Sequence, residues 1–422
     1  MKRRARRSRI GLALAGGGPL GGIYEVGALI AIADSLAGLD VNELDVYVGV
    51  SSGALVTGAL ANRISPAQIH RLFIDDGADA LALQSIFLRP AVGEISRRLL
   101  QLPALTLSAV WKAIKDPLHA GVGESLATIA KAMPVGMFDN RKLDRLLRTL
   151  FEAPGRSNDF RTLGRKLFLV ATHLDSAAPV VFGGRGSDHV PVSRAIVASS
   201  ALPGLFPPVE IDGEHYVDGA LNKTLHASVA LREGVDLLLC INPLVPYDAR
   251  VTAHGRGRRA AIDKLHRGGL PLVLSQTFRA IMHSRMRGSM ERYRAQFPRA
   301  DVVLFEPERE DARMFFANVF GYRHRKRICA FAYTRTRRNL LARANELGPL
   351  LERHGISLQL DRLINAHRRV TDATRDPRPL AVGPVSRRSV RFVARNLQRM
   401  LDELERHLRD QSRSTLSSRS AT

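Results

Sequence analysis

Residues 46–61 are VYVGVSSGALVTGALA, and this stretch decides the fold. The apolar run from Val46 to Val50 is typical of a buried β-strand, and the small residues from Ala54 to Ala61 are typical of a closely packed helix. Between them, Gly49-Val50-Ser51-Ser52-Gly53 forms a Gly-x-Ser-x-Gly pentapeptide. At a sharp strand-to-helix turn, called a nucleophile elbow, this pattern exposes a serine hydroxyl above a sheet, and the flanking glycines remove Cβ atoms that would clash. We therefore predict that Ser51 is a nucleophile; the alternative is a serine in an ordinary turn.

The same succession of strand, loop and helix occurs once before, nearer the start of the chain. Residues 9–16 form a short apolar run ended by glycines, and residues 22–36 carry apolar side chains at helical spacing. Two such units within 62 residues predict a parallel sheet whose strands are connected by helical crossovers. The carboxyl ends of both strands then lie on one edge of the sheet, where ligand sites of such sheets are found.

The glycines between the first strand and helix are candidate hydrogen-bond donors. Acyl transfer requires N–H groups aimed at the oxyanion that develops in the transition state. Gly16-Gly17-Gly18 can present consecutive amides at the start of a helix, where negative charge is favoured. We predict an oxyanion hole from Gly16, Gly17 and Gly18, with Gly17 and Gly18 foremost, and with the amide of Ser52.

A nucleotide-binding function is the rival interpretation of the same loop. Gly16, Gly18 and Gly21 fit the Gly-x-Gly-x-x-Gly fingerprint of dinucleotide sites. Asp40 and Asp45 lie near the distance at which a ribose-binding acid is expected. In that fold the acid ends the second strand, whereas here the second strand ends in Ser51, which disfavours this interpretation.

The base that accepts the serine proton is predicted to be a carboxylate. Asp218 ends a short apolar segment and precedes Gly219, so it has room around it, and a carboxylate within hydrogen-bond reach can accept a serine proton directly. The alternatives are that Asp218-Gly219 is only a tight turn, or that a histidine is the base. The three histidines considered for that role, each interpreted as structural or exposed, are His173, His215 and His226.

With these motifs in place, the sequence resembles the patatin-like phospholipases over residues 8–245. That family has a glycine-rich oxyanion loop, a Gly-x-Ser-x-Gly elbow and an Asp-Gly-Ala or Asp-Gly-Gly motif with the catalytic aspartate. The resemblance implies a Ser51–Asp218 catalytic dyad and an α/β three-layer sandwich, with a mostly parallel central sheet and flanking helices. The matching segments are Gly16 to Gly21, Gly49 to Gly53, Ala198 to Pro208, and Asp218-Gly219-Ala220.

The glycine loop departs from the family pattern at one position. Family members usually carry Arg or Lys in this loop, where this chain has Leu20. A cation there would help to bind a phosphate-bearing substrate. The departure therefore weakens the prediction of a phospholipase more than that of an ester hydrolase.

The C-terminal part of the chain has a different surface. Residues 246–422 contain 37 Lys or Arg and 17 Asp or Glu, whereas residues 1–245 contain 26 and 23. We predict a catalytic domain at 8–245, a basic and mainly helical extension at 246–410, and a disordered tail at 411–422. Clustered positive charge favours an anionic membrane surface as a partner; the alternative is a set of solvated helix faces. No pattern typical of nucleic-acid binding is present, which disfavours that partner.

One segment of this extension is predicted to be an amphipathic helix, at residues 271–293. Two interpretations of its apolar face stay open, packing on the catalytic domain and docking on a membrane. Its other face is rich in arginine. The apolar residues that recur every three or four positions are Leu274, Phe278, Ile281, Met282, Met286, Met290 and Tyr293.

The remaining expectations concern location and cofactors. Only Cys240 and Cys329 are present, which favours a reducing compartment. We predict a cytoplasmic protein that can associate peripherally with the inner membrane surface. No cofactor or metal is expected, because no cluster has the spacing of metal ligands. The predicted function is hydrolysis of lipid esters through an acyl-enzyme; the alternatives are a Ser-His-Asp esterase, an acyltransferase, and a non-catalytic membrane adaptor.

Overall fold

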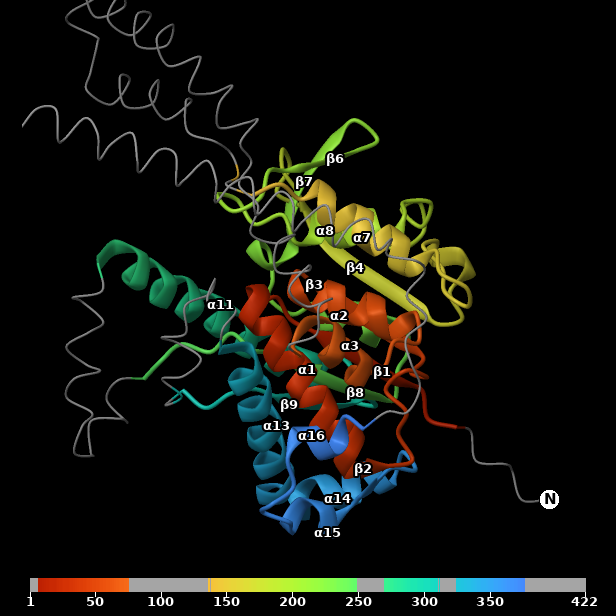
Figure 1. The fold of residues 1–422 in the computed structure, drawn as a ribbon, viewed down its shortest axis with the longest axis vertical. Coiled ribbons are helices and arrows are strands. Elements are labelled where there is room, and N and C mark those ends of the chain that lie inside the picture. Colours follow the sequence, from red (N-terminus) through yellow and green to blue (C-terminus); the bar gives the residue numbers. More distant parts are fainter. Residues whose placement is uncertain are drawn as a thin grey trace, which may run out of the picture. The chain divides into compact units, whose positions relative to one another are not determined.

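A central mixed sheet organises the protein in the computed structural model, which describes residues 7–75, 136, 138–248, 269–309, 311 and 324–375 (Figure 1). Its order is β6-β7-β4-β3-β1-β8-β9, and β5 also pairs with β4. Strands β4, β3, β1, β8 and β9 are mutually parallel, whereas β5, β6 and β7 pair antiparallel. The eight strands are β1 (Ile10–Leu14), β3 (Val46–Val50), β4 (Lys166–His173), β5 (Pro179–Phe182), β6 (Val209–Ile211), β7 (Glu214–Asp218), β8 (Leu237–Ile241) and β9 (Asp301–Phe305).

Both faces of this sheet are covered, which explains why its parallel strands are continuous apolar runs rather than alternating ones. In β1, Leu12 and Leu14 point into one core, and Ala13 points into the other. Helices α1, α2, α8 and α13 cover the first face, and α9 with the end of α11 covers the second. The predicted α/β fold with a mostly parallel sheet and flanking helices is confirmed.

The described helices connect the strands or pack on them. A two-stranded sheet of β2 (Leu36–Ala37) and β10 (Ser357–Leu358) lies apart from the main one. The helices are α1 (Gly18–Ser35), α2 (Ser52–Ala61), α3 (Pro66–Phe73), α7 (Arg141–Phe151), α8 (Val192–Ser199), α9 (Ala227–Arg232), α11 (Gly269–Gln296), α13 (Arg325–Ala342), α14 (Ala344–Glu352), α15 (Leu360–Ile364) and α16 (Val370–Ala373).

The C-terminal part contributes directly to the sheet. Strand β9 pairs in parallel with β8, and Val303 and Phe305 point into the same core as α1. Helix α13 lies alongside α1 (Figure 1), so closely that a Cβ atom on Gly27 would lie 2.4 Å from the carbonyl oxygen of Cys329. The boundary at residue 245 stays a prediction, but residues on both of its sides share one sheet and one core.

Helix α11 confirms the helix predicted for residues 271–293, and its two halves differ. Met282, Met286 and Tyr293 are buried, as expected of a helix that packs on the catalytic part. Leu274 and Ile281 are instead 57% and 52% exposed. The C-terminal half of the apolar face of α11 therefore lies in the core, as the packing interpretation expects. Its N-terminal half lies at the surface, as the docking interpretation requires.

Several expectations fall on residues outside the described ranges. These are residues 249–268, 310, 312–323 and 376–410 of the predicted basic extension, and the whole predicted tail at 411–422. Among the helices that are described, none has the length and apolar character needed to cross a bilayer.

Candidate active site

Ser51 stands at the turn between β3 and α2, in a backbone conformation that only a strained turn produces. Its φ and ψ are 52° and −121°, outside the regions that non-glycine residues usually occupy. The flanking glycines permit this turn, because a Cβ atom on Gly49 would lie 2.1 Å from the hydroxyl of Thr57. One on Gly53 would lie 2.6 Å from the carbonyl oxygen of Leu14. This is the geometry of a nucleophile elbow.

Asp218 reaches the same edge of the sheet from an antiparallel strand. It is the last residue of β7, which pairs with β4 so that Asp218 lies opposite Ala171. Its amide donates to the carbonyl oxygen of Ala201 at 3.0 Å. Gly219 is required next, because a Cβ atom there would lie 2.1 Å from the carbonyl oxygen of Val170. The chain can thus leave β7 only by a close approach to β4.

Ser51 and Asp218, 167 residues apart in the sequence, are joined by a hydrogen bond. The Ser51 hydroxyl donates to Oδ2 of Asp218 at 2.6 Å, and the amide of Ala220 donates to Oδ1 at 2.8 Å. The Asp218 side chain is only 2% exposed. Burial raises its pKa to about 6, although the bonds from Ser51 and Ala220 oppose the shift. The carboxylate is therefore ionised at neutral pH and more basic than an exposed aspartate.

Two further serines hold the elbow in place. The Ser51 amide donates to the hydroxyl of Ser199 at 2.9 Å, and that hydroxyl donates to the carbonyl oxygen of Val170 at 2.6 Å. The hydroxyl of Ser200 donates to the carbonyl oxygen of Ser51 at 3.2 Å. In the sequence this segment is marked only by its resemblance to the family, because serines before a loop give no signal of a contact 148 residues away.

The predicted oxyanion glycines lie against Ser51, but they are not equivalent. A Cβ atom on Gly16 would be 3.1 Å from Cβ of Ser51, so the loop and the nucleophile are in contact. The Gly16 amide, however, donates to the carbonyl oxygen of Thr224 at 3.0 Å. Gly17 caps α1, and Gly18 begins it with a φ of 63°. Amides at the start of a helix have no acceptor within it, which favours Gly17, Gly18 and Ser52 over Gly16 as donors.

A cavity of about 300 Å³ opens in front of this pair. Among the described residues that line it, only Asp218 and Arg279 are ionisable, and Arg279 comes from α11, outside the motif-bearing part of the chain. The apolar side chains of the lining are Pro19, Ile23, Val26, Leu55, Val56, Ile69, Phe73, Ile74, Phe138, Leu143, Ile196, Val197, Leu202, Leu205, Phe206, Ala220, Leu244 and Phe278.

The alternative bases and acids lie elsewhere. His173, His215 and His226 are all described, and none of them lines the cavity with Ser51. His226 is buried, which lowers its pKa to about 4. Asp45, one of the two candidate acids of the nucleotide interpretation, accepts a hydrogen bond from the amide of Ile10 at 2.8 Å. It thus lies at the opposite end of β1 from the glycine loop.

Two groups of titratable side chains escaped the sequence analysis. Glu25 in α1 is fully buried, and neither of its carboxyl oxygens has a hydrogen-bond partner among the described residues. Burial raises its pKa well above the ordinary value, and the nearby hydroxyl of Ser52 opposes the shift. His173, Asp175 and Glu214 place ligand atoms within 4.8 Å of one another, a potential metal-ligand group away from the Ser51 cavity. Glu214 is 41 residues from His173, so local spacing could not reveal this group.

The fold and the site together define an α/β protein with a serine nucleophile candidate at a strand end, paired with a buried aspartate. A family model described as patatin-like phospholipase matches residues 12–231. This match covers more than half of the chain, which belongs to the patatin-like phospholipase family and is a lipid acyl hydrolase. No curated protein sequence is similar enough to count as a relative.

Several solved structures also resemble the chain. One is VipD from Legionella pneumophila, 16% identical with a TM-score of 0.33, in a match that covers 78% of this chain and 69% of VipD. Another is the type III effector ExoU, 13% identical with a TM-score of 0.32, covering 80% and 53%. A third is the heterodimeric complex of ExoU with SpcU from Pseudomonas aeruginosa, 22% identical with a TM-score of 0.24, covering 47% and 38%. The match spans about half the length of ExoU.

Proposed function

We propose that the chain hydrolyses lipid esters through an acyl-enzyme, with Ser51 as nucleophile and Asp218 as its base. The observation that carries the proposal is the 2.6 Å hydrogen bond from the Ser51 hydroxyl to Asp218, made at a strained strand-to-helix turn in front of a largely apolar cavity. A nucleophile in contact with its base is the arrangement that covalent catalysis requires.

In the first half of the reaction, Asp218 accepts the Ser51 proton while Oγ forms a bond to the ester carbonyl carbon. The carbonyl oxygen becomes an oxyanion, and the amides of Gly17, Gly18 and Ser52 donate hydrogen bonds to it. The tetrahedral intermediate then expels the alcohol, which takes the proton from Asp218. In the second half, water gives its proton to Asp218, attacks the acyl-enzyme and releases the acid, and Ser51 recovers its proton.

The cavity favours a substrate with a long acyl chain. Its lining is aliphatic and aromatic from α1, α2, α3 and α8, so it can take apolar surface out of water. Arg279 is the one cationic side chain among the described residues of the lining, and it is buried. We infer that this guanidinium faces the polar end of the lipid, in place of the cation that the glycine loop lacks at Leu20.

We further propose that the protein docks peripherally on an anionic membrane surface through the N-terminal half of α11. Val273, Leu274, Phe278 and Ile281 are exposed there, and Phe278 also lines the Ser51 cavity. Apolar side chains that enter a bilayer beside exposed arginines are typical of interfacial helices. Docking at this place would bring an insoluble ester to the mouth of the cavity.

Hydrolysis of a short-chain nitrophenyl ester and of phospholipid vesicles by the purified chain tests the proposed chemistry. We expect Ser51→Ala to lower kcat by about 10⁴-fold and Asp218→Asn by about 10³-fold, because each removes one member of a unit. His215→Ala is the control, since this exposed histidine does not line the cavity. Thermal unfolding of each variant separates lost chemistry from lost folding.

The outcomes distinguish the candidate functions. Loss in both dyad variants, with activity kept in His215→Ala, supports the Ser–Asp hydrolase. Activity that survives in Asp218→Asn but disappears in His173→Ala or His226→Ala contradicts it and favours a Ser-His enzyme. Folded protein without activity on either substrate favours the adaptor.

A further inference from the structure

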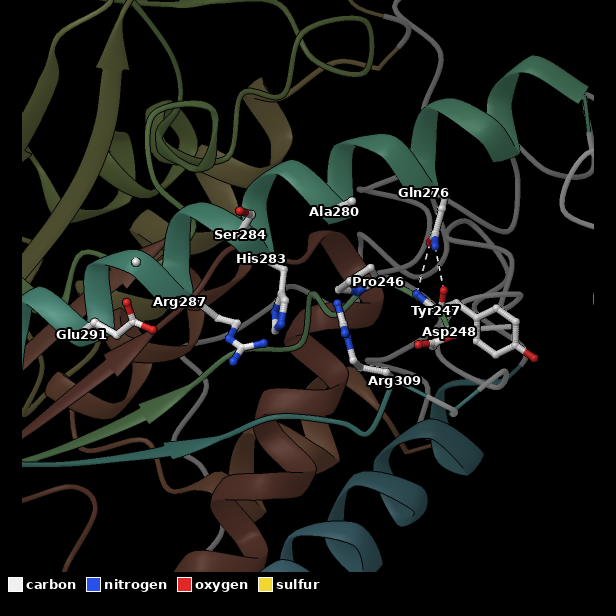
Figure 2. A pocket seen from close by; sticks show the side chains of 11 residues that line it. Pro246, Tyr247, Asp248, Gln276, Ala280, His283, Ser284, Arg287, Glu291 and Arg309 are labelled. Carbon is white, nitrogen blue, oxygen red and sulfur yellow. Dashed lines mark hydrogen bonds between the residues drawn. The ribbon is translucent and has the colours of Figure 1, made fainter. Parts of the chain in front are cut away.

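A second cavity, of about 720 Å³, lies between α11 and the segment that follows β8 (Figure 2). It shares no lining residue with the Ser51 cavity. Two hydrogen bonds close one of its ends: the Tyr247 amide donates to the Gln276 side chain at 3.2 Å, and that side chain donates to the Tyr247 carbonyl oxygen at 2.7 Å. These bonds fix the spacing between α11 and this segment, so the cavity is a built feature of the described fold.

Three nitrogen-bearing side chains converge in the middle of this cavity. Figure 2 shows the guanidinium groups of Arg287 and Arg309 on two sides of the His283 ring. Burial lowers the pKa of His283, and the positive charges of Arg309 and Arg287 lower it further. The imidazole is therefore neutral at physiological pH, and the two arginines provide the positive charge.

Neither arginine forms an ion pair with a carboxylate of the described chain. In Figure 2 the Glu291 carboxylate lies at one end of the cavity, beyond Arg287, and Asp248 lies beside Arg309, to whose carbonyl oxygen the Asp248 amide donates at 2.8 Å. Glu306 is a further acid nearby: burial raises its pKa, whereas a hydrogen bond from Asn242 at 3.3 Å and the positive charges of Arg287 and Arg309 oppose that shift. Among the described residues, therefore, no carboxylate forms an ion pair with Arg287 or Arg309, and both arginines are exposed.

His283 adds an unsatisfied polar atom. Its side chain is only 4% exposed, and Nδ1 has no hydrogen-bond partner in the described structure. A buried polar atom without a partner costs about 1–3 kcal/mol, so it is kept where a ligand or a function compensates for it. The exposed arginines leave the cavity open to such a ligand.

We propose that Arg287, Arg309 and His283 form a binding site for a phosphoryl group. Donors from three directions suit a tetrahedral oxyanion, which offers acceptor oxygens on several sides, better than they suit a planar carboxylate. The neutral imidazole supplies one N–H, from Nδ1 in the matching tautomer. The cavity is larger than a phosphate alone requires, so the natural ligand carries this group on a larger organic body.

Helix α11 connects this site with the Ser51 cavity. Arg279 and Phe278 line one cavity, and Ala280 and His283 line the other, all within two turns of the same helix. The proposal does not depend on the chemistry of Ser51, since phosphoryl binding is measured without any ester. A phosphoryl ligand would hold α11 in the position in which it completes the lipid cavity.

The test is isothermal titration of the full chain with inorganic phosphate and with glycerol 3-phosphate, at fixed ionic strength. We expect saturable binding of both, at least about tenfold weaker in Arg287→Gln and in Arg309→Gln, because each removes a charge-assisted contact. Arg294→Gln is the matched control, since Arg294 is exposed on the same helix and does not line the cavity. Sulfate should compete with phosphate, and acetate should not.

A second arm separates a lipid headgroup from a soluble phosphate ester. Vesicles with and without a phosphomonoester lipid are mixed with each variant and recovered by flotation. Binding that needs the phosphomonoester and is lost in Arg309→Gln indicates a lipid headgroup, whereas glycerol 3-phosphate binding without that dependence indicates a soluble ligand. Absence of saturable phosphate binding, or equal weakening in Arg294→Gln, overturns the proposal. Ser51→Ala should bind phosphate normally, whatever becomes of the hydrolase activity.

Discussion

The residues before and after position 245 belong to one sheet, but they contribute different features to the protein. Before it, the chain carries the glycine loop, the elbow and the Asp-Gly turn, each at the end of a strand. After it, the chain contributes β9, the long helices α11 and α13, and most of the net positive charge. The first part supplies the reacting groups, and the second closes the cavity in which they would act.

The segment that matches the family therefore does not contain the whole site. The family match ends at residue 231, yet Arg279 and Phe278 line the cavity that holds Ser51. The C-terminal part is thus joined to the N-terminal part by shared core and shared cavity. Four experiments can weaken or sharpen that conclusion.

The largest effect is expected where α1 and α13 touch. Gly27→Val places a side chain where even a Cβ atom would lie 2.4 Å from the Cys329 carbonyl oxygen, so the helices must separate. We expect a loss of about 3 kcal/mol in the free energy of unfolding, from overpacking against rigid backbone. Denaturation in urea, followed by circular dichroism, measures it.

The matched control for this change is Gly288→Ala, in the middle of α11. The nearest atom to a Cβ there is 3.9 Å away, at the end of the Arg292 side chain. Alanine should stabilise the protein by up to about 1 kcal/mol, since glycine disfavours helices. If Gly27→Val unfolds no more easily than the wild type, α13 is not an integral part of the core.

A buried carboxylate provides the second test. Asp34 at the end of α1 accepts hydrogen bonds from Tyr333 at 2.8 Å and from Nε of Arg368 at 2.6 Å. Burial by itself would raise the pKa of Asp34, but the bonds from Arg368 and Tyr333 and the nearby positive charges lower it below its ordinary value. We expect Asp34→Asn to cost about 2 kcal/mol in the free energy of unfolding.

The pH dependence of that loss has a definite sign. Since the folded-state pKa of Asp34 is depressed, its contribution is present above the unfolded pKa of about 3.9 and is lost as pH falls through the folded value. The difference between wild type and Asp34→Asn should therefore shrink below about pH 4. A difference that is constant down to pH 2 would show that the charge of Asp34 is unimportant.

How much of the fold and of the candidate site can be predicted from the sequence depends on how far apart in the sequence the contacting residues lie. Strand β3 was predicted with its observed bounds, and Ser51 was placed at its turn, because apolar runs and glycines are local signals. Asp218 is proposed as the base from its place before Gly219 and from the family resemblance together, since no local pattern joins residues 167 apart. The hairpin of β6 and β7 that delivers Asp218 was not predicted.

The C-terminal part resisted prediction for a physical reason. Its arginines give similar patterns whether they are solvated, as Arg294 is, or buried, as Arg279 is. An apolar stripe at helical spacing shows that one face of α11 is apolar, but it does not show what covers that face. Only the folded structure distinguishes Leu274, which is 57% exposed, from Met286, which is 5% exposed.

The third prediction concerns the pH dependence of activity, which we expect to be set by Asp218 in the N-terminal part. The pKa of Asp218 is raised to about 6 by burial, and the proposed base must be ionised. We therefore expect kcat/KM to be level above pH 7 and to fall about tenfold per pH unit below pH 6. The rate of nitrophenyl ester hydrolysis between pH 4.5 and 8 measures this profile, and a midpoint near pH 4 contradicts the assigned cause.

The smallest effect is expected at the surface half of α11. Leu274→Ser with Ile281→Ser removes exposed apolar surface, so the free energy of unfolding should change by less than about 0.5 kcal/mol. If this half docks on a membrane, flotation with anionic vesicles should weaken by about 30-fold or more, since each of the two side chains contributes about 1–2 kcal/mol when it enters a bilayer and 1.4 kcal/mol is a factor of ten. Met286→Ser, one to three turns further along, is the contrast: it lies in the core and should destabilise the fold. Unchanged flotation in the double variant would leave α11 as a packing element only, and the membrane-facing role of the C-terminal part would be wrong.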